Sequence, residues 1–154
     1  MIHQEEINDL FKNTPFQCTD FKIELESKEY DACQFKINGQ YIHYRKAKIT
    51  PKKAGLFVTF WKRVPSGIIA PFEVKDPLSY LVIAVANETD SGYFIFSKNT
   101  LLKQNIISSN LKEGKRAFRI YPPWSIPKNK QAITSQKWQL LHFSEELEKS
   151  VLLS

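Results

Sequence analysis

The stretch 33–63 constrains the fold more than any other part of the chain, because two turns divide it into three strand-like runs. Asn38-Gly39 is typical of a two-residue β-hairpin turn, so we expect Cys33–Ile37 and Tyr41–Ile49 to pair as antiparallel strands. The second turn spans residues 50–55. The run after it, residues 56–63, carries apolar residues on both faces, as a central strand covered on both sides does, so the sequence predicts two successive β-hairpins.

The second predicted hairpin, Tyr44–Arg63, is strongly basic. It holds seven of the 22 Lys and Arg residues of the chain and contains no Asp or Glu. Alternate residues of a strand lie about 6–7 Å apart on one face, which is close to the spacing of successive phosphates along a nucleic acid. Tyr44 and Trp61 add aromatic planes on which an unstacked base can rest. The hairpin therefore favours contact with a polyanion.

Charge is distributed unevenly along the whole chain, whose formal net charge is +6. Residues 32–72 contain eight bases and no acid, and residues 114–144 contain six bases and no acid. Residues 1–31, in contrast, carry eight acids and three bases. Two acid-free basic segments are the electrostatic pattern expected of a phosphate-binding surface.

The rest of the chain predicts an α+β fold. Amphipathic patterns predict helices near the two ends, over residues 4–13 and 129–148. Strand patterns occur at 20–26, 79–87, 93–96 and 116–121. We expect a central, largely antiparallel or mixed sheet of five or six strands flanked by N- and C-terminal helices, in a single domain over residues 1–154.

Several classes of protein are disfavoured by the sequence. The longest nearly apolar run is far too short to span a bilayer, and the first residues lack the basic-then-apolar pattern expected of a signal peptide. Cys18 and Cys33 form no metal or redox motif, which favours a cytoplasmic protein with free thiols. No Gly-rich phosphate loop, nucleophile elbow or paired-His metal motif occurs.

The candidate nucleic-acid-binding residues are basic or aromatic side chains in the two acid-free segments. They are Arg45, Lys46, Lys48, Lys52, Lys53, Trp61, Lys62, Arg63, Lys115, Arg116 and Arg119. For Arg119 two interpretations stay open: phosphate binding, or a buried ion pair with an acid such as Glu73 or Asp76.

Several motifs resemble the MepB family of small bacterial proteins. They include the run Tyr44-Arg45-x-Ala-Lys-Ile-Thr-Pro-x-Lys, the run Gly55-x-Phe-Val-Thr-x-Trp-Lys-Arg and the run Gly114-Lys-Arg-Ala-Phe-Arg-Ile-Tyr-Pro-Pro-Trp. Pro71-Phe72, Gly92-Tyr-Phe-Ile-Phe and Gln136-x-Trp-Gln-Leu fit as well. The resemblance extends over about residues 5–145.

The resemblance implies a fold similar to restriction-endonuclease-like nucleases, in which an acid and an (Asp/Glu)-x-Lys motif on adjacent strands hold Mg²⁺. Lys48 is the best match for the catalytic Lys, as the remnant of such a site. The residue two before it is Lys46 instead of an acid, and its ammonium would repel a metal. The remaining weak candidates for metal ligands are Glu29, Asp31, Glu73 and Asp76.

We therefore expect a nucleic-acid-binding protein on a nuclease-like scaffold with a degenerate metal site. It would need no cofactor, and nucleic acid, with DNA favoured, would be its partner. One alternative is a divergent endonuclease that uses Mg²⁺ with Lys48 and nearby carboxylates. A second alternative is a regulatory module whose basic face docks on an acidic protein.

Overall fold

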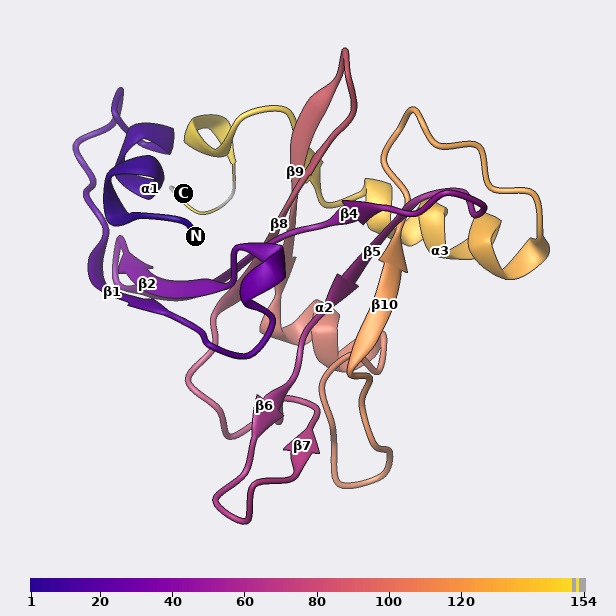
Figure 1. Ribbon diagram of the computed structural model, residues 1–154, viewed down its shortest axis with the longest axis horizontal. Helices are drawn as coiled ribbons and strands as arrows, with labels where there is room; N and C mark the ends of the chain where they lie inside the picture. Colours follow the sequence, from indigo (N-terminus) through magenta and orange to yellow (C-terminus); the bar gives the residue numbers. More distant parts are fainter. Residues whose placement is uncertain (151, 153–154) are drawn as a thin grey trace.

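Six strands form the main sheet, in the order β1-β2-β3-β8-β9-β11 (Figure 1). The structure, a computed structural model, describes residues 1–150 and 152. The sheet is mixed, because β3 and β8 run parallel while their neighbours pair antiparallel. The predicted α+β fold with a mixed sheet is confirmed. The strands are β1 Thr19–Ile23, β2 Cys33–Ile37, β3 Gln40–Lys46, β8 Tyr80–Ala86, β9 Ser91–Ser97 and β11 Phe143–Ser144.

Two smaller sheets and three α-helices complete the fold. The three-stranded sheet, in the order β10-β5-β4, consists of β10 Ala117–Ile120, β5 Leu56–Thr59 and β4 Lys48–Ile49. The two-stranded sheet pairs β6 Lys62–Arg63 with β7 Ile69–Ala70. The helices are α1 Gln4–Leu10, α2 Lys98–Lys103 and α3 Lys130–Leu140, and single 3₁₀ turns, η1 and η2, cover Lys28–Tyr30 and Leu147–Lys149.

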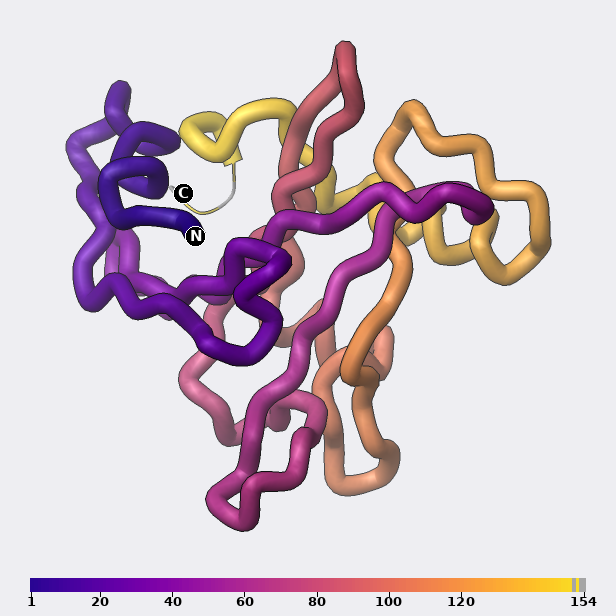
Figure 2. The backbone as a smooth tube through the Cα atoms, in the orientation of Figure 1, coloured from indigo at the N-terminus to yellow at the C-terminus, as the bar shows by residue number. Residues whose placement is uncertain are grey.

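Both faces of the main sheet are buried, which explains the nearly continuous apolar sequence of β8. Leu81 and Ile83 belong to the core that the sheet shares with the three-stranded sheet and α2. Val82, between them, belongs to a second core that includes Ile7 of α1 and Leu147 near the C-terminus. The second core brings α1 and η2 side by side, although they are far apart in the sequence (Figure 2).

The first predicted hairpin is confirmed, with Cys33 opposite Tyr44 and Ile37 opposite Gln40. Asn38 and Gly39 have φ angles of 49° and 73°, as a two-residue hairpin turn requires.

The second predicted hairpin, Tyr44–Arg63, is wrong in its extent. β3 ends at Lys46, and Ala47, which donates to Ala84 O, takes the chain out of the main sheet. Only Lys48 and Ile49 pair with β5. Buried Ala47 leads the chain from one sheet to another, so the strand predicted over 41–49 is divided between two sheets.

The predicted helix over residues 129–148 ends early. Asn129 caps α3 by accepting from Ala132 N at 2.8 Å, but the helix stops at Leu140. Phe143 and Ser144 instead pair with Phe94 and Tyr93 at the edge of the main sheet. The apolar residues beyond Leu140 therefore extend a sheet.

No helix in the described part of the chain is long and apolar enough to cross a membrane. The predicted single domain over residues 1–154 includes residues 151 and 153–154, which lie outside the described residues.

Candidate nucleic-acid interface

Arg45 was a candidate for phosphate binding, but its side chain is fully buried between the two sheets. Its Nη1 is hydrogen-bonded to the Glu24 carboxylate, and its Nε donates to Thr59 O at 3.2 Å. The guanidinium also lies over the ring of Phe60, 5.2 Å from the centroid. An arginine in this position joins β3, β5 and the segment after β1, and it does not reach a ligand on the surface.

The Glu24 carboxylate is the counter-ion of this buried site. Its other oxygen lies 3.2 Å from His43 Nδ1, and His43 packs edge-on against Phe72. Burial by itself would raise the pKa of Glu24, but the hydrogen bond to His43 and the positive charge and hydrogen bond of Arg45 outweigh it and hold the pKa below its ordinary value. Glu24 is therefore ionised at neutral pH and neutralises Arg45.

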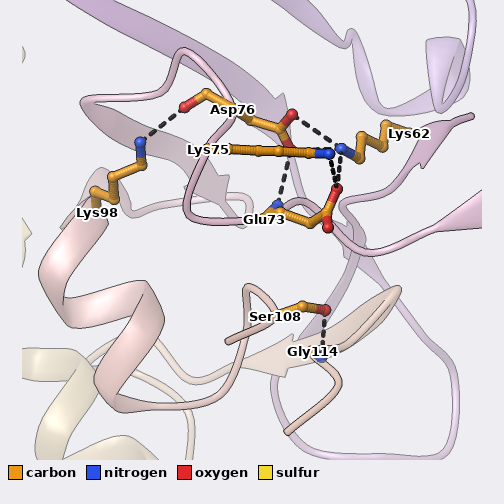
Figure 3. Close-up of polar contacts among 7 residues, drawn as sticks. All are labelled: Lys62, Glu73, Lys75, Asp76, Lys98, Ser108 and Gly114. Carbon is orange, nitrogen blue, oxygen red and sulfur yellow. Dashed lines mark hydrogen bonds and ion pairs between the residues drawn. The ribbon is translucent and has the colours of Figure 1, made fainter. Parts of the chain in front are cut away.

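Lys62, a second candidate, is neutralised as well (Figure 3). Its Nζ lies 2.7 Å from Glu73 Oε2 and 2.8 Å from Asp76 Oδ2. Lys75 adds a weaker contact to Glu73 at 3.8 Å, and Lys98 donates to Asp76 O. Partial burial opposes the charge on Lys62, but its hydrogen bonds to Asp76 and Glu73 prevail and raise its pKa. Its ammonium fastens the loop 73–76 to β6.

The residues present do not fit a Mg²⁺ site. In the described ranges, 1–150 and 152, no group of three or more His, Cys, Asp and Glu side chains could hold a metal. Mg²⁺ requires octahedral oxygen ligands, whereas the two carboxylates that do converge, Glu73 and Asp76, are both bonded to Lys62. Nor does any carboxylate of the described residues lie within 4.0 Å of Lys48 Nζ.

Lys48 instead lies on the outer face of the three-stranded sheet. Leu56 and Val58 of β5 point into the core, so Phe57 between them points outward. Lys48 and Arg119 are its cross-strand neighbours on either side. Lys48, Phe57 and Arg119 thus form an outer row across the three strands. The two cations of this row lie about 10 Å apart, which is two strand spacings, with the half-buried ring of Phe57 between them. Lys48 Nζ also lies over the ring of Tyr30, 4.9 Å from the centroid.

Arg119 joins the two basic segments of the sequence. Its Nε donates to Ala54 O at 3.1 Å, and its Nη2 donates to Gly55 O and Thr50 Oγ1. These bonds fasten the turn 50–55, which carries Lys52 and Lys53, to β10. The turn extends toward the same side of the molecule as α3 (Figure 2). Of the two interpretations of Arg119, pairing with Glu73 or Asp76 is wrong, because Lys62 bonds both acids.

Gly55 allows this close approach. Its φ is +78°, and a Cβ there would lie 2.6 Å from Tyr121 Cδ1 and 2.7 Å from Ile120 O. A larger residue at this position would strain the backbone and push the turn away from β10.

A groove of about 800 Å³ lies beside this turn, between β10 and α3. Gln139 of α3 forms its inner end, where it accepts from Tyr121 N at 2.8 Å and donates to Arg119 O at 3.0 Å. The amide thus pairs with the edge of β10 as a neighbouring strand would. Lys115, Arg119 and Lys130 line the groove, and none of its described lining residues is an acid.

The remaining predicted residues divide into two sets. Arg63 pairs with Glu26 at 3.4 Å and lies beside the ring of Trp61, and Arg116 pairs with Glu113 at 2.9 Å. The other set is exposed and has no carboxylate within 4.0 Å among residues 1–150 and 152. It contains Lys46, Lys48, Lys52, Lys53 and Lys115.

The structure adds residues that the sequence pattern does not single out. Lys130 has no distinctive neighbours in the sequence, but it lies in the groove with Lys115 and Arg119. Trp138 and Gln139 also line the groove. The sequence signal that could have indicated them is the acid-free segment 114–144, which contains all three residues.

Fold and groove together define a small α+β protein with a mixed sheet and an exposed basic groove. The MepB-like family matches residues 24–145, so the chain belongs to this family. The chain is similar to the crystal structure of MepB, with a TM-score of 0.83 and 33% identity over 96% of this chain and 100% of that chain. No curated protein matches the sequence.

Proposed function

We propose that this protein binds the phosphate backbone of nucleic acid through a basic face formed by the turn 50–55, the outer row of the three-stranded sheet and the groove beside α3. One observation carries the proposal. Arg119 joins two basic segments far apart in sequence, and four exposed lysines of these segments have no carboxylate within 4.0 Å among the described residues: Lys48, Lys52, Lys53 and Lys115. A solvated cluster of one charge attracts a polyanion.

The basic face replaces the wider set expected from the sequence. It keeps Lys48, Lys52, Lys53, Lys115 and Arg119 and adds Lys130, whereas Lys46 is exposed at the end of β3 in the main sheet and is not counted in this face. Arg45, Lys62, Arg63 and Arg116 are excluded because acids already neutralise them. About six contacts predict a slope near −5 for log K against log salt on duplex and near −4 on a single strand.

The nuclease-like scaffold belongs to this proposal. The resemblance to the MepB family implies a restriction-endonuclease-like fold, and we interpret the present chain as a version that binds without cutting. The bonding of Lys62 to both Glu73 and Asp76 supports this, because an ammonium occupies the carboxylate oxygens that a metal would use. We propose DNA as the natural ligand, in a cytoplasmic setting.

A salt titration with labelled random-sequence duplex and single strands tests the proposal. We expect binding at low salt with the slopes given above. Absence of binding at low salt, or a slope near zero, would overturn it. When Mg²⁺ or Mn²⁺ is added to the same samples, we expect the nucleic acid to stay intact. Cleavage that Lys48→Ala abolishes would instead establish the endonuclease. A protein that co-purifies with the chain and is displaced by polyglutamate would favour the docking module.

A further inference from the structure

The groove beside α3 has the size of a site for a small molecule. Its volume is about 800 Å³, and pockets that enclose small ligands measure roughly 300–1,000 Å³. A space of this size accepts a base, its sugar and a phosphate. A base pair with its two backbones does not fit into it, so a duplex can contact only the rim.

The groove combines positive charge with unused polar groups. Gln131, Thr134 and Ser135 of α3 line it, and none of the hydrogen bonds found among the described residues uses their side chains. Gln136 and Gln139 of the same helix are both bonded to backbone groups. Free amides and hydroxyls beside cations suit a ligand that has base edges as well as phosphate oxygens.

The edge of β10 supplies further donors. Phe60 N donates to Arg116 O. The register of the two strands therefore directs the backbone N–H and C=O groups of Phe118 and Ile120 toward β5. The backbone groups of Ala117 and Arg119 therefore point to the other side, which is the groove. Gln139 pairs with Arg119 O, which leaves Ala117 N–H and Arg119 N–H directed at the groove.

Trp138 gives the groove an aromatic wall. The side chain is half-buried, and its ring packs against Phe96 with centroids 5.2 Å apart. His142 lies against the same ring at 6.5 Å. These contacts hold the indole in place, and stacking on a fixed aromatic ring is worth about 1–3 kcal/mol per base.

We propose that this groove holds one unpaired nucleotide of a nucleic-acid strand, with its phosphate beside Lys115, Arg119 and Lys130 and its base beside Trp138. The inference rests on the proposed function and deepens it. Lys52 and Lys53, on the turn that Arg119 fastens, would contact the phosphates that follow. The protein would therefore prefer single strands to duplex, and duplex would bind through the rim alone.

Anisotropy measurements at one salt concentration test this with a short labelled single strand and its blunt duplex. We expect the single strand to bind roughly tenfold more tightly, as one stacked base implies. Thr134→Trp fills the groove without changing its charge, and it should reduce single-strand affinity to that of the duplex. Ile133→Trp, the matched control, places the same ring on an exposed position of α3 that does not line the groove, and it should keep the preference.

A free nucleoside monophosphate provides a test that needs no variant. In excess over the unaltered protein, it should weaken single-strand binding and leave duplex binding unchanged. The inference would be overturned if the single strand and the duplex bound with equal affinity and neither Thr134→Trp nor the monophosphate had an effect. The proposed function would then still stand. Failure to bind either nucleic acid at low salt would overturn both, and polyglutamate binding that Thr134→Trp blocks would assign the groove to an acidic protein.

Discussion

The cations of the stretch 44–63 belong to two regions that behave in opposite ways. Arg45, Lys62 and Arg63 are bonded to Glu24, Glu73, Asp76 and Glu26, so their charge serves the fold. Lys48, Lys52 and Lys53, in the middle of the same stretch, have no such partner among residues 1–150 and 152. Basic residues that are neighbours in sequence therefore have different roles, decided by which acids the fold brings to them.

The acids come from outside the basic stretch. Glu24 and Glu26 belong to the acid-rich segment 1–31, which the fold places beside β3 and β6. Glu73 and Asp76 come from the segment that follows. No acid of either segment in the described part of the chain lies within 4.0 Å of the ammonium groups of Lys52 and Lys53 in the turn 50–55. The lesson is that an acid-free run of sequence indicates an exposed basic surface only where no distant acid returns to it.

The largest effect is expected on protein stability, where an acid that neutralises one of the buried cations is removed. Glu24→Ala leaves Arg45 buried without a counter-ion, which should lower the free energy of unfolding by about 3–5 kcal/mol. Urea denaturation measures this loss, and Glu5→Ala, on the exposed face of α1, is the control. Nucleic-acid affinity of the folded variant should not change. A loss below about 1 kcal/mol would contradict a buried ion pair.

The same carboxylate gives a pH dependence. The pKa of Glu24 in the folded protein lies below its ordinary value of 4.5, so its ionised form stabilises the fold fully above that value. The stabilisation is lost as the pH falls through the lower folded pKa. Glu24→Gln should therefore show a flatter acid limb than the unaltered chain in denaturation at pH 7 and below 4.5.

An intermediate effect is expected on nucleic-acid affinity when the exposed lysines without a carboxylate partner among the described residues are replaced. Replacing Lys52, Lys53 and Lys115 together by Ala should weaken binding roughly 100-fold and reduce the steepness of the salt dependence by about three. The unfolding free energy should change little, because these side chains are exposed. A triple Ala variant at Lys12, Lys22 and Lys149 removes the same charge elsewhere. Equal loss in both triples would show that net charge, and not the basic face, determines affinity.

The smallest effect is expected at Lys62. Lys62→Ala removes an ammonium that holds the loop 73–76, and partial exposure limits the cost to about 1 kcal/mol. Its affinity for nucleic acid should stay within about twofold of the unaltered protein, since one phosphate contact would be worth more. A tenfold loss would place Lys62 in the interface and remove the distinction between the two regions.

Local patterns predict the strands and one hairpin well, because Asn38-Gly39 and period-two alternation act over a few residues. Local patterns fail where tertiary contacts determine which sheet or helix a residue joins. Ala47 resembles any strand residue, but it leads the chain into a second sheet. Phe143 resembles the end of a helix, but it pairs with β9. Arg45 could not be assigned to the interior without knowing that Glu24 returns to it.

Of the cations expected at the candidate site, the structure leaves some exposed and pairs others with acids. The two acid-free segments indicated the basic face, and Arg119 brings them together. The groove could not be foreseen, because its walls depend on where α3 lies against β10. No periodicity encodes that placement.

The pairing of Gln139 with β10 has a consequence for association between copies of the chain. An uncovered strand edge is a template on which another chain can add a strand, and proteins protect such edges in several ways. Here one side-chain amide takes up Tyr121 N–H and Arg119 C=O, the two groups that a second chain would need first. A single glutamine of a neighbouring helix thus covers part of the edge along which the short sheet could otherwise add a strand from another molecule.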